Sequence, residues 1–238
     1  MIARPLLSNF FFLLISLLCF PLLGEESALY TLFSPPKNWQ VLNPKTLDPS
    51  VKIAFSSKDK KAFVPSMNLV EEKVQVPIEE YLKIVKKLHE SGRQTRWRNL
   101  GSFQTKAGSA FLTEIDTKAD GSEIRILQLI FHQDQAVYLL TAACTKQDFP
   151  LYQKDFLESF RSLQRVKDLT LAIADSSKKS SLQEKIPSLL SFLKDPSFQK
   201  KHWGPFEKWV LKEFQEEGSY WQILMLTSLQ KEIASQVL

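Results

Sequence analysis

Residues 109–145 read SAFLTEIDTKADGSEIRILQLIFHQDQAVYLLTAACT, which is a series of strand-like segments joined by short turns. Apolar and β-branched residues, which favour a pleated and half-buried strand, are concentrated in three segments, 109–117, 123–131 and 136–145. Asp120-Gly121 lies between the first two segments, and this dipeptide is a signal of a tight hairpin. Because short turns join antiparallel neighbours, residues 109–145 predict an antiparallel meander, and residues 96–103 add a fourth strand before it.

Two amphipathic helices flank the predicted meander. In the first, residues 77–90, apolar Tyr81, Val85 and Leu88 recur at helical spacing, and charged residues occupy the other positions. The second helix covers residues 150–163 and has the same kind of apolar stripe, formed by Tyr152, Phe156, Phe160 and Leu163. Three further strands are expected before the first helix, at 29–33, 51–55 and 65–74.

Residues 25–163 therefore predict an α+β domain. Its antiparallel β-sheet needs cover for its apolar faces, and the two helices can supply it in an α/β/α-type sandwich. Residues 164–181 are expected to be a linker, because Ser176 to Ser181 is polar and low in complexity. Residues 182–238 are expected to be a helical bundle or appendage, in which Gly204-Pro205 begins one helix and Gly218 ends it.

The first 24 residues are unlike the rest of the chain. Arg4 precedes an almost wholly apolar run from Phe10 to Leu23, which Pro21 interrupts, and Gly24 stands before two acidic residues. This order of charge, apolar run, helix break and small residue is typical of a signal peptide. We predict that residues 1–24 direct export to the periplasm or another extracytoplasmic space. Leu22 fits a cleavage site poorly, so retention of the segment as a membrane anchor stays open as an alternative.

Composition and motifs favour a protein that binds rather than catalyses. The net charge of +5 is spread along the chain among acidic residues, which argues against nucleic-acid binding. His89, His132 and His202 are far apart in sequence and lack the spacing of a metal site. No nucleophile elbow and no phosphate-binding glycine loop is present in the sequence. We therefore assign no catalytic, cofactor-binding or metal-binding residue.

The predicted domain opens with Phe33-Ser34-Pro35-Pro36 and Trp39, continues with the segments 51–55 and 65–70, and ends with Phe160-Arg161-Ser162-Leu163. In the order and spacing of these segments, residues 29–163 resemble the Mog1/PsbP-like superfamily. Members of this superfamily are mostly accessory or partner-binding proteins without catalytic activity. The resemblance implies a bacterial exported member, since the branch that binds small GTPases works inside the cell. The region 164–238 departs from the family pattern.

Two groups of residues could provide chemistry instead. Glu114 and Asp116 share one face of a predicted strand, with Glu123 across the hairpin and Arg125 within cross-strand reach. Paired carboxylates can act as acid and base, although we favour a solvated sheet edge whose charge Arg125 balances. Cys144 follows an apolar run and is expected to be a buried hydrophobic residue, although a neighbouring His132 could activate it as a nucleophile. A hydrolase that uses these carboxylates or Cys144 is the alternative function.

The favoured interpretation is an exported, non-catalytic accessory protein with an unidentified protein partner and a membrane surface as a second binding target. Candidate contact residues are basic or aromatic, because such residues are enriched where proteins meet partners and acidic lipids. They are Arg96, Trp97, Arg98, Trp203, Trp209 and Trp221.

Overall fold

The computed structural model describes residues 29–237 except 92–93 and 120. The predicted signal peptide or anchor, residues 1–24, lies outside the described residues. No helix within the described ranges has the length and apolar character that crossing a bilayer requires. The described chain divides into two compact units, 39–101 with 111–149, and 29–38 with 102–110 and 150–237.

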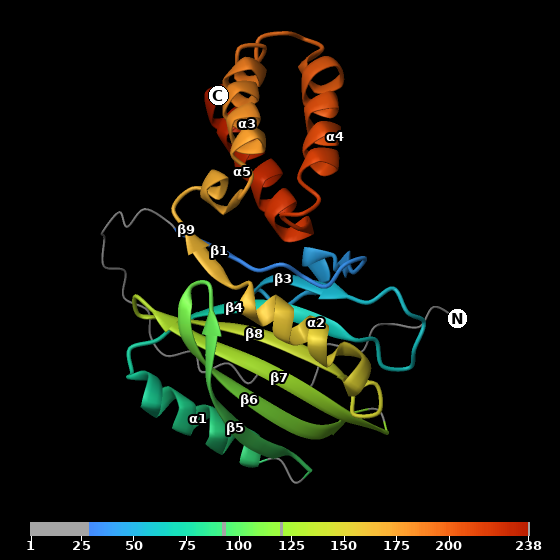
Figure 1. Ribbon diagram of the computed structural model, residues 1–238, viewed down its shortest axis with the longest axis vertical. Coiled ribbons are helices and arrows are strands. Elements are labelled where there is room, and N and C mark those ends of the chain that lie inside the picture. Colours follow the sequence, from blue (N-terminus) through green and yellow to red (C-terminus); the bar gives the residue numbers. More distant parts are fainter. Residues whose placement is uncertain (1–28, 92–93, 120, 238) are drawn as a thin grey trace. The chain divides into compact units, whose positions relative to one another are not determined.

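A seven-stranded antiparallel sheet forms most of the first unit (Figure 1). Its order is β2-β3-β4-β8-β7-β6-β5. The last four strands are the predicted meander in reverse order, and β8 joins it to β4. The strands are β2 (Gln40–Val41), β3 (Val51–Ser56), β4 (Ser66–Lys73), β5 (Arg96–Thr105), β6 (Gly108–Ala119), β7 (Ser122–Gln133) and β8 (Ala136–Thr145). The α+β class and the four meander strands are confirmed.

Turn chemistry explains why the meander strands are neighbours. Ala119 pairs with Ser122 across the first hairpin, and Gly121 has the left-handed φ of +77° that the Asp-Gly signal predicts. In the second hairpin Asp134 and Gln135 have φ values of +53° and +60°. Positive φ at both central residues is the geometry of a type I′ turn, whose twist matches that of the flanking strands.

Helix α1 (Ile78–Glu90) covers part of one face of this sheet. Tyr81 and Val85 are buried against a cluster of sheet residues, Val70, Ile130, Val137 and Leu139. The opposite face is buried as well, since Leu129 and Leu140 are both 0% exposed. Burial on both faces explains why the sequence of β8 is almost continuously apolar instead of alternating.

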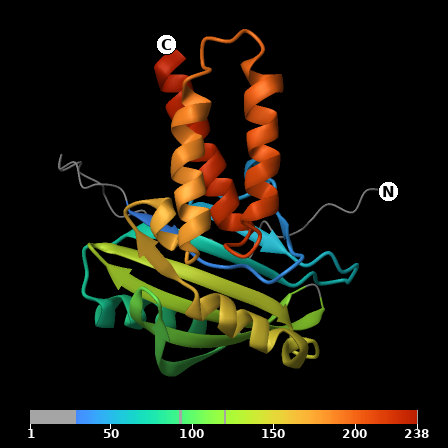
Figure 2. The same ribbon diagram turned by 45° about the horizontal axis from the view of Figure 1, so that its top comes forward.

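The second unit combines a short sheet with helices. Strands β1 (Tyr30–Leu32) and β9 (Gln164–Val166) pair antiparallel. The helices are α2 (Phe149–Arg161), the 3-10 helix η2 (Leu169–Ala172), α3 (Ser176–Leu190), the π-helical turn η3 (Gln199–Trp203), α4 (Gly204–Glu213) and α5 (Ser219–Val237). Figures 1 and 2 show α3, α4 and α5 side by side, and one buried cluster contains residues from all three.

The structure corrects the prediction of a linker over residues 164–181. These residues form β9, η2 and the first six residues of α3. The Asp175 carboxylate caps α3 by accepting hydrogen bonds from the backbone N–H groups of Ser177 and Lys178, at 2.8 and 3.2 Å. Leu182 is 0% exposed and anchors the helix in the core. The polar run from Ser176 is therefore the exposed start of a capped helix, while the division into domains at residue 163 stays a prediction.

Candidate functional site

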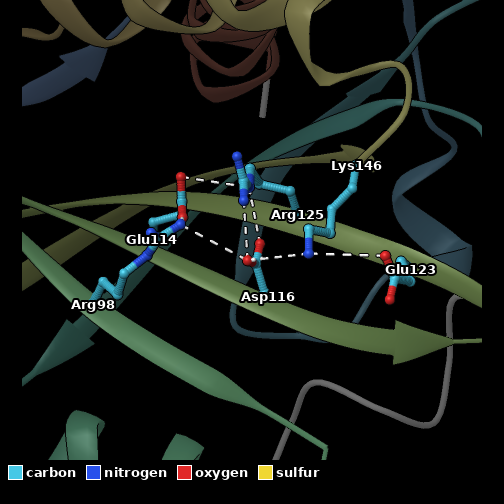
Figure 3. A network of polar contacts seen from close by, with 6 residues as sticks. All are labelled: Arg98, Glu114, Asp116, Glu123, Arg125 and Lys146. Carbon is cyan, nitrogen blue, oxygen red and sulfur yellow. Dashed lines mark hydrogen bonds and ion pairs between the residues drawn. The ribbon is translucent and has the colours of Figure 1, made fainter.

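The meander carries a network of acidic and basic side chains on one face of the sheet (Figure 3). Asp116 on β6 lies directly opposite Arg125 on β7. The Arg125 guanidinium donates two hydrogen bonds to the Asp116 carboxylate, from Nε to Oδ1 at 2.8 Å and from Nη2 to Oδ2 at 3.0 Å. This two-point contact has the planar geometry that makes arginine–carboxylate pairs strong and oriented.

Glu114 joins the same network, because residues two apart on a strand point to the same face. Its Oε2 lies 3.4 Å from Nε of Arg125, and its Oε1 forms an ion pair with Nη2 of Arg98 on β5. The Glu114 side chain is only 9% exposed. The expected solvated sheet edge is therefore wrong for Glu114: β6 lies between β5 and β7, and its carboxylate is held away from water.

Lys146 closes the network at its other end. Its Nζ lies 3.5 Å from Asp116 Oδ2 and 3.8 Å from Glu123 Oε2. The three cations of the network face three carboxylates, so the charges drawn in Figure 3 cancel. We call these six residues the meander network: Arg98, Glu114, Asp116, Glu123, Arg125 and Lys146.

Hydrogen bonding sets the protonation state of the central carboxylate. The hydrogen bonds from Arg125 hold the pKa of Asp116 below its usual range although burial opposes this, and the positive charges of Arg125, Lys146 and Arg98 act in the same direction. A lowered pKa favours the ionised form at neutral pH. Asp116 therefore suits an ion pair, whereas a general acid requires a raised pKa.

Cys144 lies next to the meander network, but its environment makes the thiol unreactive. It pairs with Arg125 in the sheet and is 0% exposed. Burial, and after it the charge of Asp148, raises the pKa of the Cys144 thiol to about 12. His132 is seven residues from Arg125 along β7, roughly 23 Å away along the strand and on the opposite face of the sheet. The pairing of His132 with Cys144 that could activate a nucleophile is therefore wrong.

The other two histidines also have local roles. Burial lowers the pKa of His89, so at its helix C-terminus the neutral form is favoured. A helix C-terminus favours a cation, but at His89 desolvation outweighs this effect. His202 Nε2 lies 2.9 Å from Asp195 Oδ2. Within the described residues, 29–237 without 92–93 and 120, no group of three or more His, Cys, Asp or Glu side chains is arranged to hold a metal ion.

Several solved structures match part of this chain, whereas no family model and no curated protein matches it. One match is LpqN, described as involved in cell envelope biogenesis of Mycobacterium tuberculosis, with 10% identity, a TM-score of 0.47, and coverage of 60% of this chain and 87% of LpqN. A second is the cyanobacterial PsbP protein CyanoP of Synechocystis, with 10% identity, a TM-score of 0.41, and coverage of 60% and 97%.

A third match is a protein of unknown function from Pseudomonas aeruginosa, with 13% identity, a TM-score of 0.41, and coverage of 52% of this chain and 95% of that protein. A PsbP protein, from the superfamily that residues 29–163 resemble in sequence, is among these matches.

Strand alternation separates the basic and aromatic residues of β5 that we predict as one partner-binding cluster. Arg96 is exposed, and Arg98 belongs to the meander network. Trp97 points to the other face, where it is half-buried against Ile115, Ile124 and Ile126. Lys86 Nζ lies 6.0 Å from the centre of the Trp97 ring. Of the three residues, Arg96 has the side chain most available to a partner.

Two of the three predicted tryptophan contacts are core residues. Trp203 and Trp221 are 4% and 2% exposed in the buried cluster of the second unit, and Trp209 packs against that cluster while half-buried. Because the side chains of Trp203 and Trp221 are enclosed in the core, they are not available at the surface as the predicted partner contacts. The role of Trp209 in partner binding stays a prediction.

Sequence reasoning missed two members of the meander network, Arg98 and Lys146. Arg98 is assigned above to partner binding, and Lys146 is not singled out. The available signal in the sequence was a basic residue on β5, Arg98, and another directly after β8, Lys146. Recognising the two cations required the register of β5 against β6 and the position of the residue that follows β8, and neither follows from the local sequence.

Proposed function

We propose that this chain is an exported, non-catalytic accessory protein that binds a partner outside the cytoplasm. The meander network carries the non-catalytic half of this proposal. Its carboxylates are held by arginine and lysine in a charge-neutral arrangement, as expected of an interaction that orders strands. The one other reactive candidate, Cys144, has a buried thiol with a raised pKa. Export is proposed from the pattern of residues 1–24.

The reactivity of the Cys144 thiol distinguishes this proposal from the hydrolase alternative. In the folded protein at pH 8, we expect the Cys144 thiol to react with a thiol-specific reagent roughly a thousandfold more slowly than in urea. A pKa near 12 leaves about one thiolate in ten thousand at that pH, whereas a free cysteine is about a quarter ionised. The measurement is the rate of labelling, with Cys19→Ser in the background so that Cys144 is the only thiol.

A matched control carries an added Lys154→Cys, since the Lys154 side chain is 84% exposed. Its new thiol should label at the rate of a free cysteine under the same conditions. If Cys144 in the folded protein were labelled as fast as that exposed thiol, it would not be buried and unreactive. That result would support the alternative in which Cys144 is a nucleophile.

Export and partner binding are tested together by producing the full chain, tagged at its C-terminus, in a bacterial host. We expect the extracytoplasmic fraction to contain a protein that begins near Glu25, and mass spectrometry measures this directly. A full-length form held in the membrane would support the anchored alternative. Full-length protein confined to the cytoplasm would contradict the proposal.

The tagged protein is then used to capture partners from the same fraction. We expect Arg96→Glu, which reverses an exposed charge on β5, to weaken capture, and Lys154→Glu on α2 to leave it unchanged. Equal capture by both variants would contradict a contact at Arg96. Deleting residues 164–238 is unsuitable as a test, because it would remove β9, the partner of β1, and the core around Leu32.

A further inference from the structure

The turn that joins α3 to α4 combines an exposed aromatic ring with exposed lysines. It spans residues 191–203 and forms the end of the helix pair drawn in orange (Figures 1 and 2). We call it the α3–α4 tip. Its exposed members include one aromatic residue, Phe192, and three lysines, Lys194, Lys200 and Lys201.

Phe192 is held at the surface by specific contacts. It is 44% exposed, yet its ring stacks on the His202 imidazole with 4.1 Å between ring centres and 6° between planes. His202 is in turn placed by its contact with Asp195 at 2.9 Å, and the next residue, Trp203, is buried in the core. One face of the Phe192 ring therefore packs on His202, and the exposed part of the ring is available for an apolar contact with another molecule.

The charges around this ring are mostly positive. Asp195 is the one acidic residue in 191–203, so three lysines and one aspartate give the tip a net charge of +2 with His202 neutral. The Asp195 carboxylate is engaged by the backbone N–H of Ser197 at 2.8 Å and its hydroxyl at 2.7 Å, as well as by His202. The lysines therefore present a cationic surface around an aromatic ring.

Two other exposed apolar residues of this unit, Leu211 and Leu151, lack that setting. Leu211 on α4 is also 44% exposed, but it adjoins Lys212 and Glu213, whose charges cancel. Leu151 on α2 is 71% exposed and shares its helix face with the Lys154–Glu158 ion pair. An exposed aromatic ring within a surface of net positive charge complements a bilayer that has an apolar interior and anionic headgroups.

We propose that the α3–α4 tip docks on an anionic lipid surface. The Phe192 ring enters the boundary between headgroups and acyl chains, where aromatic rings are favoured, while the lysines contact lipid phosphates. Each lysine near such a surface raises the partition coefficient about fivefold. This contact is additional to the protein partner proposed above and does not depend on it.

The test is cosedimentation of the chain that begins at Glu25 with lipid vesicles. This form contains every described residue and lacks the apolar segment 1–24, which would insert into vesicles by itself. We expect binding to phosphatidylcholine vesicles that contain about one third phosphatidylglycerol, little binding to phosphatidylcholine alone, and loss of binding in high salt.

Two variants and two matched controls locate the contact. Phe192→Ser should lower the partition coefficient about tenfold, and Lys200→Gln with Lys201→Gln about twentyfold. The controls Leu211→Ser and Lys154→Gln, which change equally or more exposed side chains elsewhere, should stay within about twofold of the unchanged chain. Circular dichroism confirms that each variant is folded.

Binding that is equal for both vesicle types, or unaltered in the tip variants, would overturn the proposal. So would loss of a captured protein in the tip variants while vesicle binding is unchanged, because the tip would then serve a protein partner. None of these outcomes tests export or the low reactivity of the Cys144 thiol. The proposed function is therefore tested independently of the lipid contact.

Discussion

Replacing Trp221 with alanine is expected to lower the free energy of unfolding by about 4 kcal/mol, the cost typical of removing a buried tryptophan. The indole is 2% exposed and stacks on Phe214 with ring centres 5.0 Å apart. Its Nε1–H donates a hydrogen bond of 2.8 Å to the carbonyl of Leu169. Alanine would leave a cavity and an unpaired buried carbonyl, and both effects destabilise the folded state.

Urea unfolding followed by far-ultraviolet circular dichroism measures this loss. Trp221→Phe fills most of the volume and removes only the hydrogen bond, so it should cost about 1 to 2 kcal/mol. Leu211→Ala, at a half-exposed position on α4, should cost less than about 1 kcal/mol. A Trp221→Ala protein within about 1 kcal/mol of the unchanged chain would show that Trp221 is not central to this core.

The second large effect is expected at the meander network. Arg125→Met should lower the free energy of unfolding by about 3 kcal/mol at neutral pH, because it leaves Asp116 and Glu114 charged and largely buried without their shared partner. The pKa of Asp116 is lowered in the folded protein, chiefly by Arg125. Its contribution is therefore present above the unfolded pKa of about 4 and is lost as pH falls. The difference between the two proteins should shrink below pH 4.

Urea unfolding at several pH values measures this difference. A double variant, Arg125→Met with Asp116→Asn, removes both partners and should recover part of the loss, since one buried charge is no longer left unpaired. The control Lys52→Met breaks the Lys52–Glu71 ion pair, in which the side chains are 51% and 33% exposed, and should change stability by less than about 1 kcal/mol. A loss for Arg125→Met as small as that of the control, at neutral pH, would contradict a stabilising network.

Local patterns predicted the secondary structure of the first unit well. The segment 77–90 becomes α1 over Ile78–Glu90, and the four meander strands appear within a few residues of their expected bounds. These signals depend on neighbours in the chain, such as apolar spacing and turn residues, so they can be read from sequence alone. The same reasoning failed over 176–181, where the cap at Asp175 and the burial of Leu182 decide that polar residues form a helix.

The functional interpretation depended more on pairing between distant segments. The sequence indicated that Glu114, Asp116 and Arg125 share one sheet face, because a hairpin of known turn brings them together. It assigned Arg98 and Trp97 to one cluster, although adjacent residues of a strand point to opposite faces. It treated Trp203 and Trp221 as surface candidates, although the packing of α3, α4 and α5 encloses them.

By itself, the sequence determined the α+β class, the antiparallel meander, the helix after β4 and the position of Arg125 within cross-strand reach of Glu114 and Asp116. Only the tertiary structure decided that Arg98 and Lys146 complete the meander network, that His132 lies far from Cys144, and that Phe192 rather than Trp203 or Trp221 is exposed among lysines. The physical reason is the range of each interaction. Periodicity and turns act over a few residues, whereas burial and ion pairing depend on segments that are distant in the chain and meet only on folding.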